Sequence, residues 1–132
     1  MKNILITGGA GLVGSVLTNG LKDKFNIKIL DVKNVEGVDS HVGDISKLDS
    51  IMPAFKDVDT VVHLAGDRRV HGEWESILNN NIVGLYNIYE AARLSGVKRV
   101  IFASSQHATG GFYFVEPYSF INDGEYEKLP ND

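Results

Sequence analysis

Three glycines and one aspartate near the N-terminus have the types and spacing that nucleotide binding requires. Gly8, Gly11 and Gly14 lie in the stretch TGGAGLVG, directly after a short apolar run. Asp31 closes the next apolar run, twenty residues after Gly11. Because glycine has no Cβ, a pyrophosphate can approach the backbone of such a turn closely. The pattern therefore predicts a dinucleotide site; the alternative is a glycine turn that serves the fold alone.

The residues around the glycines sharpen this prediction. A helix that opens at Leu12 and Val13 offers unpaired N–H groups and the positive end of its dipole to a phosphate. An acid about 20 residues beyond the turn accepts hydrogen bonds from the 2′- and 3′-hydroxyls of an adenosine ribose. The same charge repels the 2′-phosphate of NADP, so Asp31 favours NAD over NADP. A turn-capping role is the alternative for Asp31.

Two further groups of candidate residues follow later strands of the predicted sheet. Asp44 is placed to take the adenine amino group, and Ile45 to pack on the ring face; the alternative for Asp44 is a helix-start aspartate. Leu64, Ala65 and Gly66 end another apolar run. Small residues there would let a cofactor lie across the carboxyl edge of the sheet.

Three polar residues complete the candidate set. Asn81 ends a run of three asparagines within a predicted helix, and we expect it to turn inward and brace the backbone near the site, with a solvated face as the alternative. Ser105 follows the last predicted strand, where its hydroxyl could orient a substrate carbonyl or hydroxyl; the alternative is a strand-end serine that satisfies backbone groups. We expect His63 to be a core residue. The four histidines show no metal-ligand spacing, so no metal site is predicted.

These candidates need a fold that brings strand ends to one edge. Hydrophobic patterning predicts the following elements: strands at 2–6, 27–30, 41–42, 59–65 and 100–103, and helices at 12–24, 46–55 and 73–95. Ser46 is the expected cap of the second helix, Gly20 is expected to mark close packing in the first, and Gly96 to end the third. Near-continuous apolar strands between helices indicate an α/β fold with a doubly wound parallel sheet.

Composition narrows the function classes. The chain has 132 residues, 43% of them hydrophobic, and a net charge of −4, so it can form one domain with a core. No basic patch favours nucleic acid or an anionic membrane as a partner. Cysteine is absent, and no apolar run approaches the ~20 residues that span a bilayer. We expect a cytoplasmic protein.

The last residues differ in character from the rest. We divide the chain into a nucleotide-binding domain over 1–111 and an aromatic tail over 112–132 that belongs to the same domain. The tail begins with the aromatic residues Phe112, Tyr113, Phe114, Tyr118 and Phe120. Such a segment needs a surface to pack on, so we expect a loop on the substrate side; the alternative is an extension folded on the sheet.

Six motifs, taken in order, resemble the extended short-chain dehydrogenases/reductases, the NAD-dependent epimerase/dehydratase family of nucleotide-sugar and sugar-acid enzymes. The motifs are TGGAGLVG, Asp31, GDI at 43–45, HLAG at 63–66, NIVG at 81–84 and ASS at 103–105. The resemblance covers residues 1–111, and the stretch FASSQH at 102–107 is most similar to the uronate dehydrogenase-like branch. It implies a Rossmann-like sheet of five strands in the order 3-2-1-4-5.

The resemblance also implies a role for each candidate. The pyrophosphate would lie on Gly8, Gly11, Leu12, Val13 and Gly14, and the rest of NAD on Asp31, Asp44, Ile45, Leu64, Ala65 and Gly66. Asn81 would be structural support, and Ser105 would match the active-site Ser/Thr. The substrate would be a sugar, a sugar acid or a nucleotide sugar. Apart from the resemblance, the apolar residues of the long helix cover more than one stripe, so we expect a homodimer with part of this helix as its dimer face.

The chain departs from the family at the catalytic base. The family uses the tyrosine of a Y-x-x-x-K motif, and none of the five tyrosines here is followed by lysine at that spacing. We therefore expect a truncated protein that lacks the C-terminal part of the family fold and binds NAD without turnover. The competing hypothesis is a non-catalytic NAD-sensing or protein-interaction module.

Overall fold

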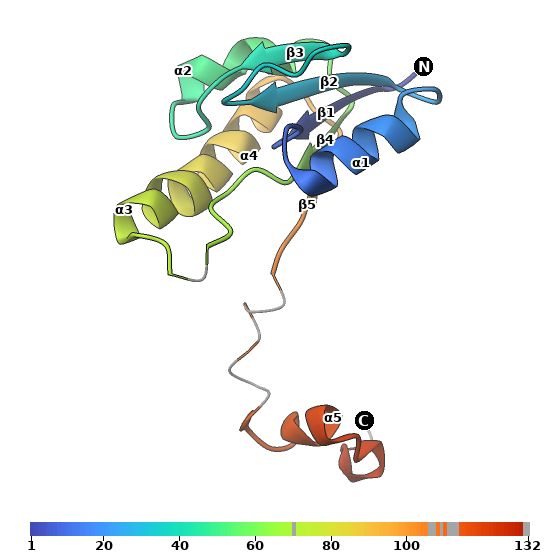
Figure 1. Ribbon diagram of the computed structural model, residues 1–132, viewed down its shortest axis with the longest axis vertical. Helices are drawn as coiled ribbons and strands as arrows, with labels where there is room; N and C mark the ends of the chain where they lie inside the picture. The colour runs from blue at the N-terminus through green and yellow to red at the C-terminus, as the bar shows by residue number, and fades with distance from the viewer. Residues whose placement is uncertain (70, 106–107, 109, 111–113, 131–132) are drawn as a thin grey trace.

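A five-stranded parallel sheet organises the protein (Figure 1). The computed structural model describes residues 1–69, 71–105, 108, 110 and 114–130. The strands are β1 (Asn3–Thr7), β2 (Asn26–Asp31), β3 (Asp39–Val42), β4 (Thr60–His63) and β5 (Arg99–Phe102). Their order in the sheet is β3-β2-β1-β4-β5, and every pairing is parallel. The predicted fold class and strand order are confirmed.

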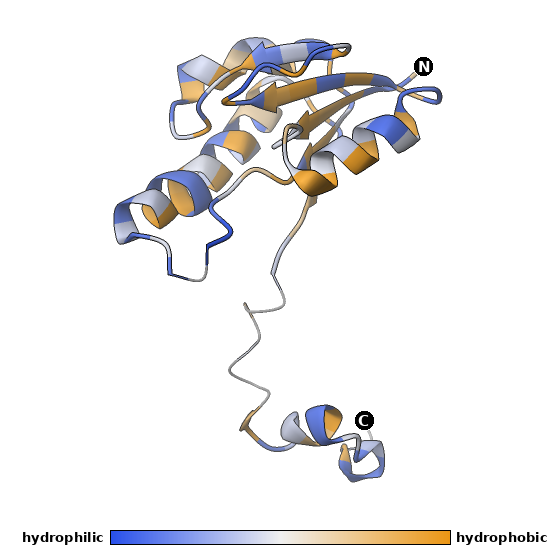
Figure 2. Ribbon diagram, in the orientation of Figure 1, coloured by the Kyte–Doolittle hydropathy of each residue, from blue (hydrophilic) through white to orange (hydrophobic). Residues whose placement is uncertain are grey.

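Helices cover both faces of this sheet. The described helices are α1 (Leu12–Leu21), α2 (Leu48–Ile51), α3 (Trp74–Ile77), α4 (Gly84–Leu94) and α5 (Ser119–Asp123), with 3-10 turns at Met52–Phe55 and Tyr126–Lys128 and a π-helical segment at Leu78–Val83; α1, α2 and α4 cover the sheet. On one face, Leu17 and Leu21 of α1 pack on the buried core. On the other face, α2 and α4 pack around Leu5 of β1. Strands β1, β2 and β4 contribute buried apolar residues to the core on both faces, and β1 and β4 are largely apolar in the hydropathy colouring of Figure 2.

The second helix is shorter than predicted. Helix α2 begins at Leu48 after Lys47, and no side chain caps it. The expected cap, Ser46, instead donates its hydroxyl to the carboxylate of Asp44. Beyond α2 the chain tightens into a 3-10 turn that contains Pro53, which has no N–H for the helical ladder. The predicted packing role of Gly20 is also wrong, because nothing lies within 4 Å of a Cβ built there.

The long helix predicted at 73–95 is continuous, but its middle is not α-helical. The segment Leu78–Val83 is a π-helix between α3 and α4, and it contains the three asparagines. The helix ends as expected at Gly96, whose N–H donates to Arg93 O, while the N–H of Val97 donates to Ala92 O.

The described part of the tail lies away from the sheet, where it forms α5 and a 3-10 turn (Figure 1). Phe114 is 85% exposed there and Tyr126 is 64% exposed. Phe112 and Tyr113, which were part of the tail prediction, lie outside the described residues. Among the described helices, none is both long and apolar enough to cross a membrane.

Candidate functional site

The carboxyl ends of the strands meet at one edge of the sheet and form a cleft. Thr7 pairs with Leu30 on one side and with His63 on the other, so the ends of β2, β1 and β4 are level. The cleft has a volume of about 990 Å³, in the range of small-molecule sites. Its walls include ten of the twelve residues predicted to bind cofactor: Gly8, Gly11, Leu12, Val13, Gly14, Asp31, Ile45, Leu64, Ala65 and Gly66.

One wall is the glycine turn, residues 8–14, between β1 and α1. Gly8 has a φ of +72°, and a Cβ there would lie 2.9 Å from Ala65 N. A Cβ on Gly14 would lie 2.6 Å from Gly9 Cα. Gly11 precedes α1 without a side-chain cap. Backbone therefore packs on backbone in this turn, and the first N–H groups of α1 face the cleft without a side chain over them.

Asp31 joins this turn to the end of β2. Its Oδ2 accepts a hydrogen bond from the N–H of Ala10 at 2.9 Å, and its Oδ1 accepts one from the N–H of Lys33 at 3.2 Å. A carboxylate has about four lone-pair sites, so acceptor capacity remains for a hydroxyl in the cleft.

Beneath the cleft, a buried polar pair joins the ends of β1 and β4. Thr7 Oγ1 accepts the N–H groups of Leu64 and Ala65, each at 3.2 Å, and lies 2.7 Å from Nδ1 of His63. Because the hydroxyl already accepts two bonds, it donates its hydrogen to Nδ1. His63 is 1% exposed and stacks on Phe102, and burial lowers its pKa to about 4. The prediction of a satisfied core histidine is confirmed.

The remaining predicted residues lie outside the walls of the cleft. The carboxylate of Asp44 accepts both the N–H and the hydroxyl of Ser46, which lowers its pKa and fits the local role weighed from the sequence. Ser105 follows β5 and is exposed. Asn81 turns inward as expected, and its side chain makes two hydrogen bonds to the backbone of Asp67, at 2.6 Å and 2.8 Å.

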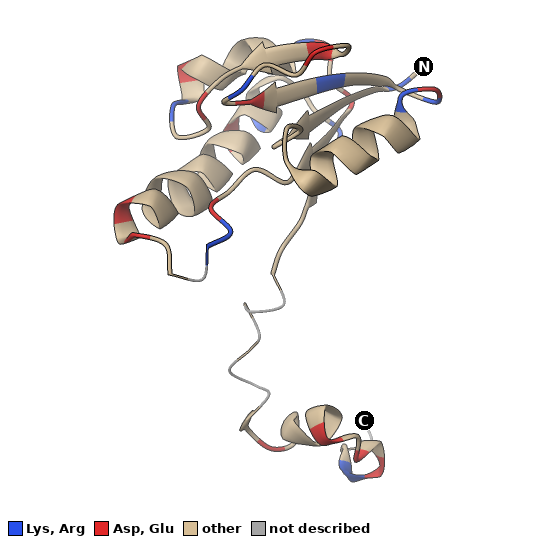
Figure 3. Ribbon diagram, viewed as in Figure 1, with Lys and Arg blue, Asp and Glu red and all other residues tan. Residues whose placement is uncertain are grey.

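The second wall is the loop after β4, residues 64–69, and part of it was missed from the sequence. Asp67, Arg68 and Arg69 line the cleft, as does Lys33 beyond Asp31. Figure 3 shows both charge signs on the segment between β4 and α3. Hydrogen bonds from Arg69 and Ser76 hold the pKa of the Asp67 carboxyl well below its ordinary value. In the sequence, these wall residues were indicated only by three consecutive charged residues, 67–69, which follow Gly66 just beyond the predicted strand.

The chemistry of these walls suits a dinucleotide rather than a metal. Within the described ranges, no three His, Cys, Asp or Glu side chains gather as metal ligands. The walls instead offer backbone N–H groups, the carboxylates of Asp31 and Asp67 and a few cations, and such donors and acceptors match phosphates and ribose hydroxyls.

Known proteins share this architecture and much of the sequence. Uronate dehydrogenase of Pseudomonas syringae pv. tomato is 40% identical over 83% of this chain and 42% of its own length. L-arabinose 1-dehydrogenase (NAD(P)(+)) of Haloferax volcanii is 37% identical over 81% of this chain and 42% of its own. A mutant of uronate dehydrogenase from Agrobacterium tumefaciens, solved in complex with NAD, has a TM-score of 0.74 at 36% identity and shares 81% of this chain and 42% of its own.

This chain spans about two fifths of the length of these relatives. The model of the NAD dependent epimerase/dehydratase family matches residues 4–124. Strand order, cleft position and sequence similarity agree, and the chain belongs to the NAD dependent epimerase/dehydratase family.

Proposed function

We propose that this chain binds NAD in the cleft at the carboxyl edge of its sheet. The observation that carries the proposal is the convergence of three groups on one cleft: the glycine turn, the uncapped N-terminus of α1 and the carboxylate of Asp31. The strand order changes direction beside β1, where ligands of open α/β sheets bind.

Each wall residue has a role in this proposal. Gly8, Gly11 and Gly14 let the pyrophosphate approach the backbone, and the N–H groups of Leu12 and Val13 would bind its oxygens. At one end, Asp31 would bind the ribose hydroxyls and Ile45 would pack on the adenine, with Asp44 beside it. Leu64, Ala65 and Gly66 would line the rest of the cofactor, and Asn81 would support their loop.

The parent activity we propose is an NAD-dependent oxidoreductase or epimerase that acts on a sugar, a sugar acid or a nucleotide sugar. Relatives named as uronate dehydrogenases support a sugar acid. In such an enzyme the nicotinamide supplies hydride chemistry, and Ser105 would orient the reacting hydroxyl. This chain has no Tyr followed by Lys at the family spacing, so we expect cofactor binding without the ~10²–10⁴-fold contribution of a general base.

The test is calorimetric titration of the full chain with NAD and with NADP. We expect NAD to bind more tightly than NADP. In Asp31→Ala, loss of charge-assisted hydrogen bonds to the ribose should weaken NAD about tenfold and narrow the difference between the two cofactors. Asp23→Ala, which removes an exposed carboxylate outside the cleft walls, is the matched control and should bind as the wild type does. A folded wild-type chain that binds neither cofactor would overturn the proposal.

We also propose a homodimer that uses the surface of the long helix. Five large apolar residues are exposed along it: Trp74 at 67%, Ile82 at 52%, Tyr86 at 68%, Tyr89 at 46% and Leu94 at 53%. Sedimentation of the wild type against Tyr86→Asp tests this surface: a dimer should dissociate in the variant, whereas a monomeric wild type would contradict the proposal.

A further inference from the structure

The carboxylate of Asp67 accepts hydrogen bonds from two residues, Arg69 and Ser76, and from both the backbone and the side chain of Arg69. It accepts the N–H of Arg69 at 3.0 Å and its Nε at 2.9 Å and 3.1 Å, and the Nη2 of the same guanidinium contacts it as well. The hydroxyl of Ser76 donates to it at 2.6 Å. The Asp67 side chain is only 7% exposed, whereas that of Arg69 is 61% exposed. This carboxylate is thus the buried centre of a polar network.

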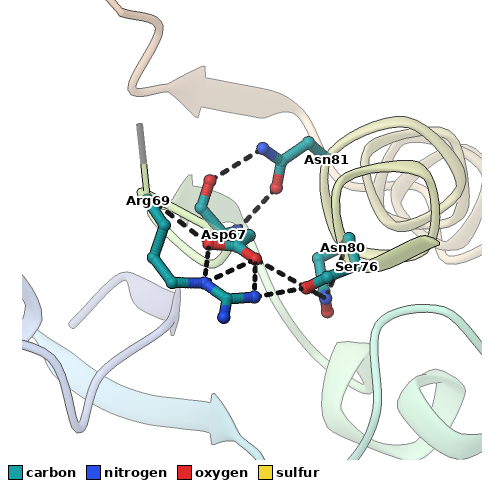
Figure 4. A network of polar contacts seen from close by, with 5 residues as sticks. All are labelled: Asp67, Arg69, Ser76, Asn80 and Asn81. Atoms are coloured by element: carbon teal, nitrogen blue, oxygen red, sulfur yellow. Dashed lines mark hydrogen bonds and ion pairs between the residues drawn. The ribbon is translucent and has the colours of Figure 1, made fainter. Parts of the chain in front are cut away.

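The network joins the loop after β4 to the long helix. Asn81 binds both the N–H and the carbonyl of Asp67, and Asn80 Nδ2 donates to the carbonyl of Ser76 at 2.9 Å. Figure 4 shows the five side chains, here called the Asp67 network: Asp67, Arg69, Ser76, Asn80 and Asn81. The π-helical segment carries two of them, and π turns often occur at functional sites.

The network decides which charge of this loop is left for the cleft. Asp67 and Arg69 neutralise each other within it. Arg68 lies between them and lines the cleft, and within the described part of the chain it makes no hydrogen bond or ion pair.

Strand order tells which half of a dinucleotide meets this loop. Asp31 ends β2, the glycine turn follows β1, and the loop follows β4 on the far side of β1. A dinucleotide with its adenosine at Asp31 and its pyrophosphate at the glycine turn must extend its second nucleoside toward the loop.

We propose that Asp67 is a positioning residue, which through Arg69, Ser76 and Asn81 holds the loop after β4 as the wall for the nicotinamide half of NAD. This inference rests on the proposed NAD binding. Asp67 itself acts through the loop, and its effect is therefore confined to ligands that extend beyond the pyrophosphate.

The test compares two ligands on the full chain. AMP reaches only the adenosine end of the cleft, whereas NAD spans both halves. In Asp67→Asn the amide no longer matches the donors of Arg69, so we expect the Kd for NAD to rise about tenfold and the Kd for AMP to stay within about twofold. Glu90→Gln is the matched control, because it breaks a similar carboxylate–arginine pair, with Arg93, on α4 outside the cleft. It should leave both affinities unchanged.

Ser76→Ala provides a milder variant that removes one donor to Asp67, and a rise of about threefold in the Kd for NAD alone is expected. If Asp67→Asn does not fold, the affinities of Ser76→Ala for NAD and AMP test the positioning role of Asp67. Equal losses for NAD and AMP, or no loss for either, would overturn the positioning role while leaving NAD binding in place. A folded wild type that binds neither ligand would overturn the proposed function and this inference with it.

Discussion

The two walls of the cleft are built by different physics. The glycine turn is held by close backbone packing: a Cβ on Gly8 would lie 2.9 Å from Ala65 N. The loop after β4 is held by polar side chains that come from a helix fourteen residues away, as in the Asp67–Asn81 bonds. The first wall tolerates no side chain at Gly8 or Gly14, whereas the second depends on several side chains. Steric exclusion fixes a turn for any sequence that keeps its glycines, but a polar network needs each partner in place.

The largest expected effect tests the close backbone packing of the glycine turn. Gly8→Ala places a Cβ against Ala65 at a φ of +72°, so left-handed strain and overpacking should together destabilise the fold by about 4 kcal/mol in urea unfolding. Gly37→Ala is the control, because its φ is +78° but nothing lies within 4 Å of its Cβ. It should lose only about 1–2 kcal/mol. Equal losses of unfolding free energy in the two variants would contradict the claim that close backbone packing holds this wall.

The second largest effect tests the buried pair of Thr7 and His63, which joins the ends of β1 and β4. Burial lowers the pKa of His63 to about 4 from 6.5, so between these values the unfolded chain binds the proton that the folded chain excludes. Stability from this residue is complete above pH 6.5 and falls by about 3 kcal/mol as the pH drops to 4. His63→Asn keeps an acceptor for Thr7 but cannot titrate. The difference between the unfolding free energies of variant and wild type should therefore change across this window, and a constant difference would contradict the buried neutral histidine.

A smaller effect tests the hydrogen bonds that hold the loop after β4. Asn81→Ala removes two hydrogen bonds to the backbone of Asp67 and leaves an N–H and a carbonyl without their partners, so we expect a loss of about 2 kcal/mol in thermal or urea unfolding. Asn79→Ala is the control, since within the described part of the chain the Asn79 side chain makes no hydrogen bond. That variant should be neutral. Similar losses of stability in both variants would mean that the loss comes from replacing asparagine in the helix and not from breaking the hydrogen bonds to Asp67.

The smallest effect is a gain in stability. Gly20 lies within α1, and nothing is within 4 Å of its Cβ position. Gly20→Ala should stabilise the chain by about 0.5–1 kcal/mol, because alanine loses less backbone entropy in a helix. A loss in melting temperature would show that α1 has contacts which the open space around Gly20 does not reveal.

The same contrast explains what could be predicted from the sequence. The strands, the glycine turn and Asp31 follow from local periodicity and spacing, whereas the strand order came from the family resemblance; the structure places all of them as predicted. Of the Asp67 network only the inward turn of Asn81 was predicted; the rest could not be, because its partners are polar residues on separate elements and no periodic pattern links them. The π-helical segment and the early start of the 3-10 turn at Met52 were missed for a similar reason: tertiary contacts and one proline decide them.

The central claim is that both walls form one NAD site. Hydrogen–deuterium exchange of the full chain, with and without NAD, tests it directly. The account predicts slower exchange in the glycine turn and in the loop after β4 together, with little change in α5, which lies away from the sheet. Protection of one wall alone, or none at NAD concentrations that saturate binding, would contradict a single site built from the two walls.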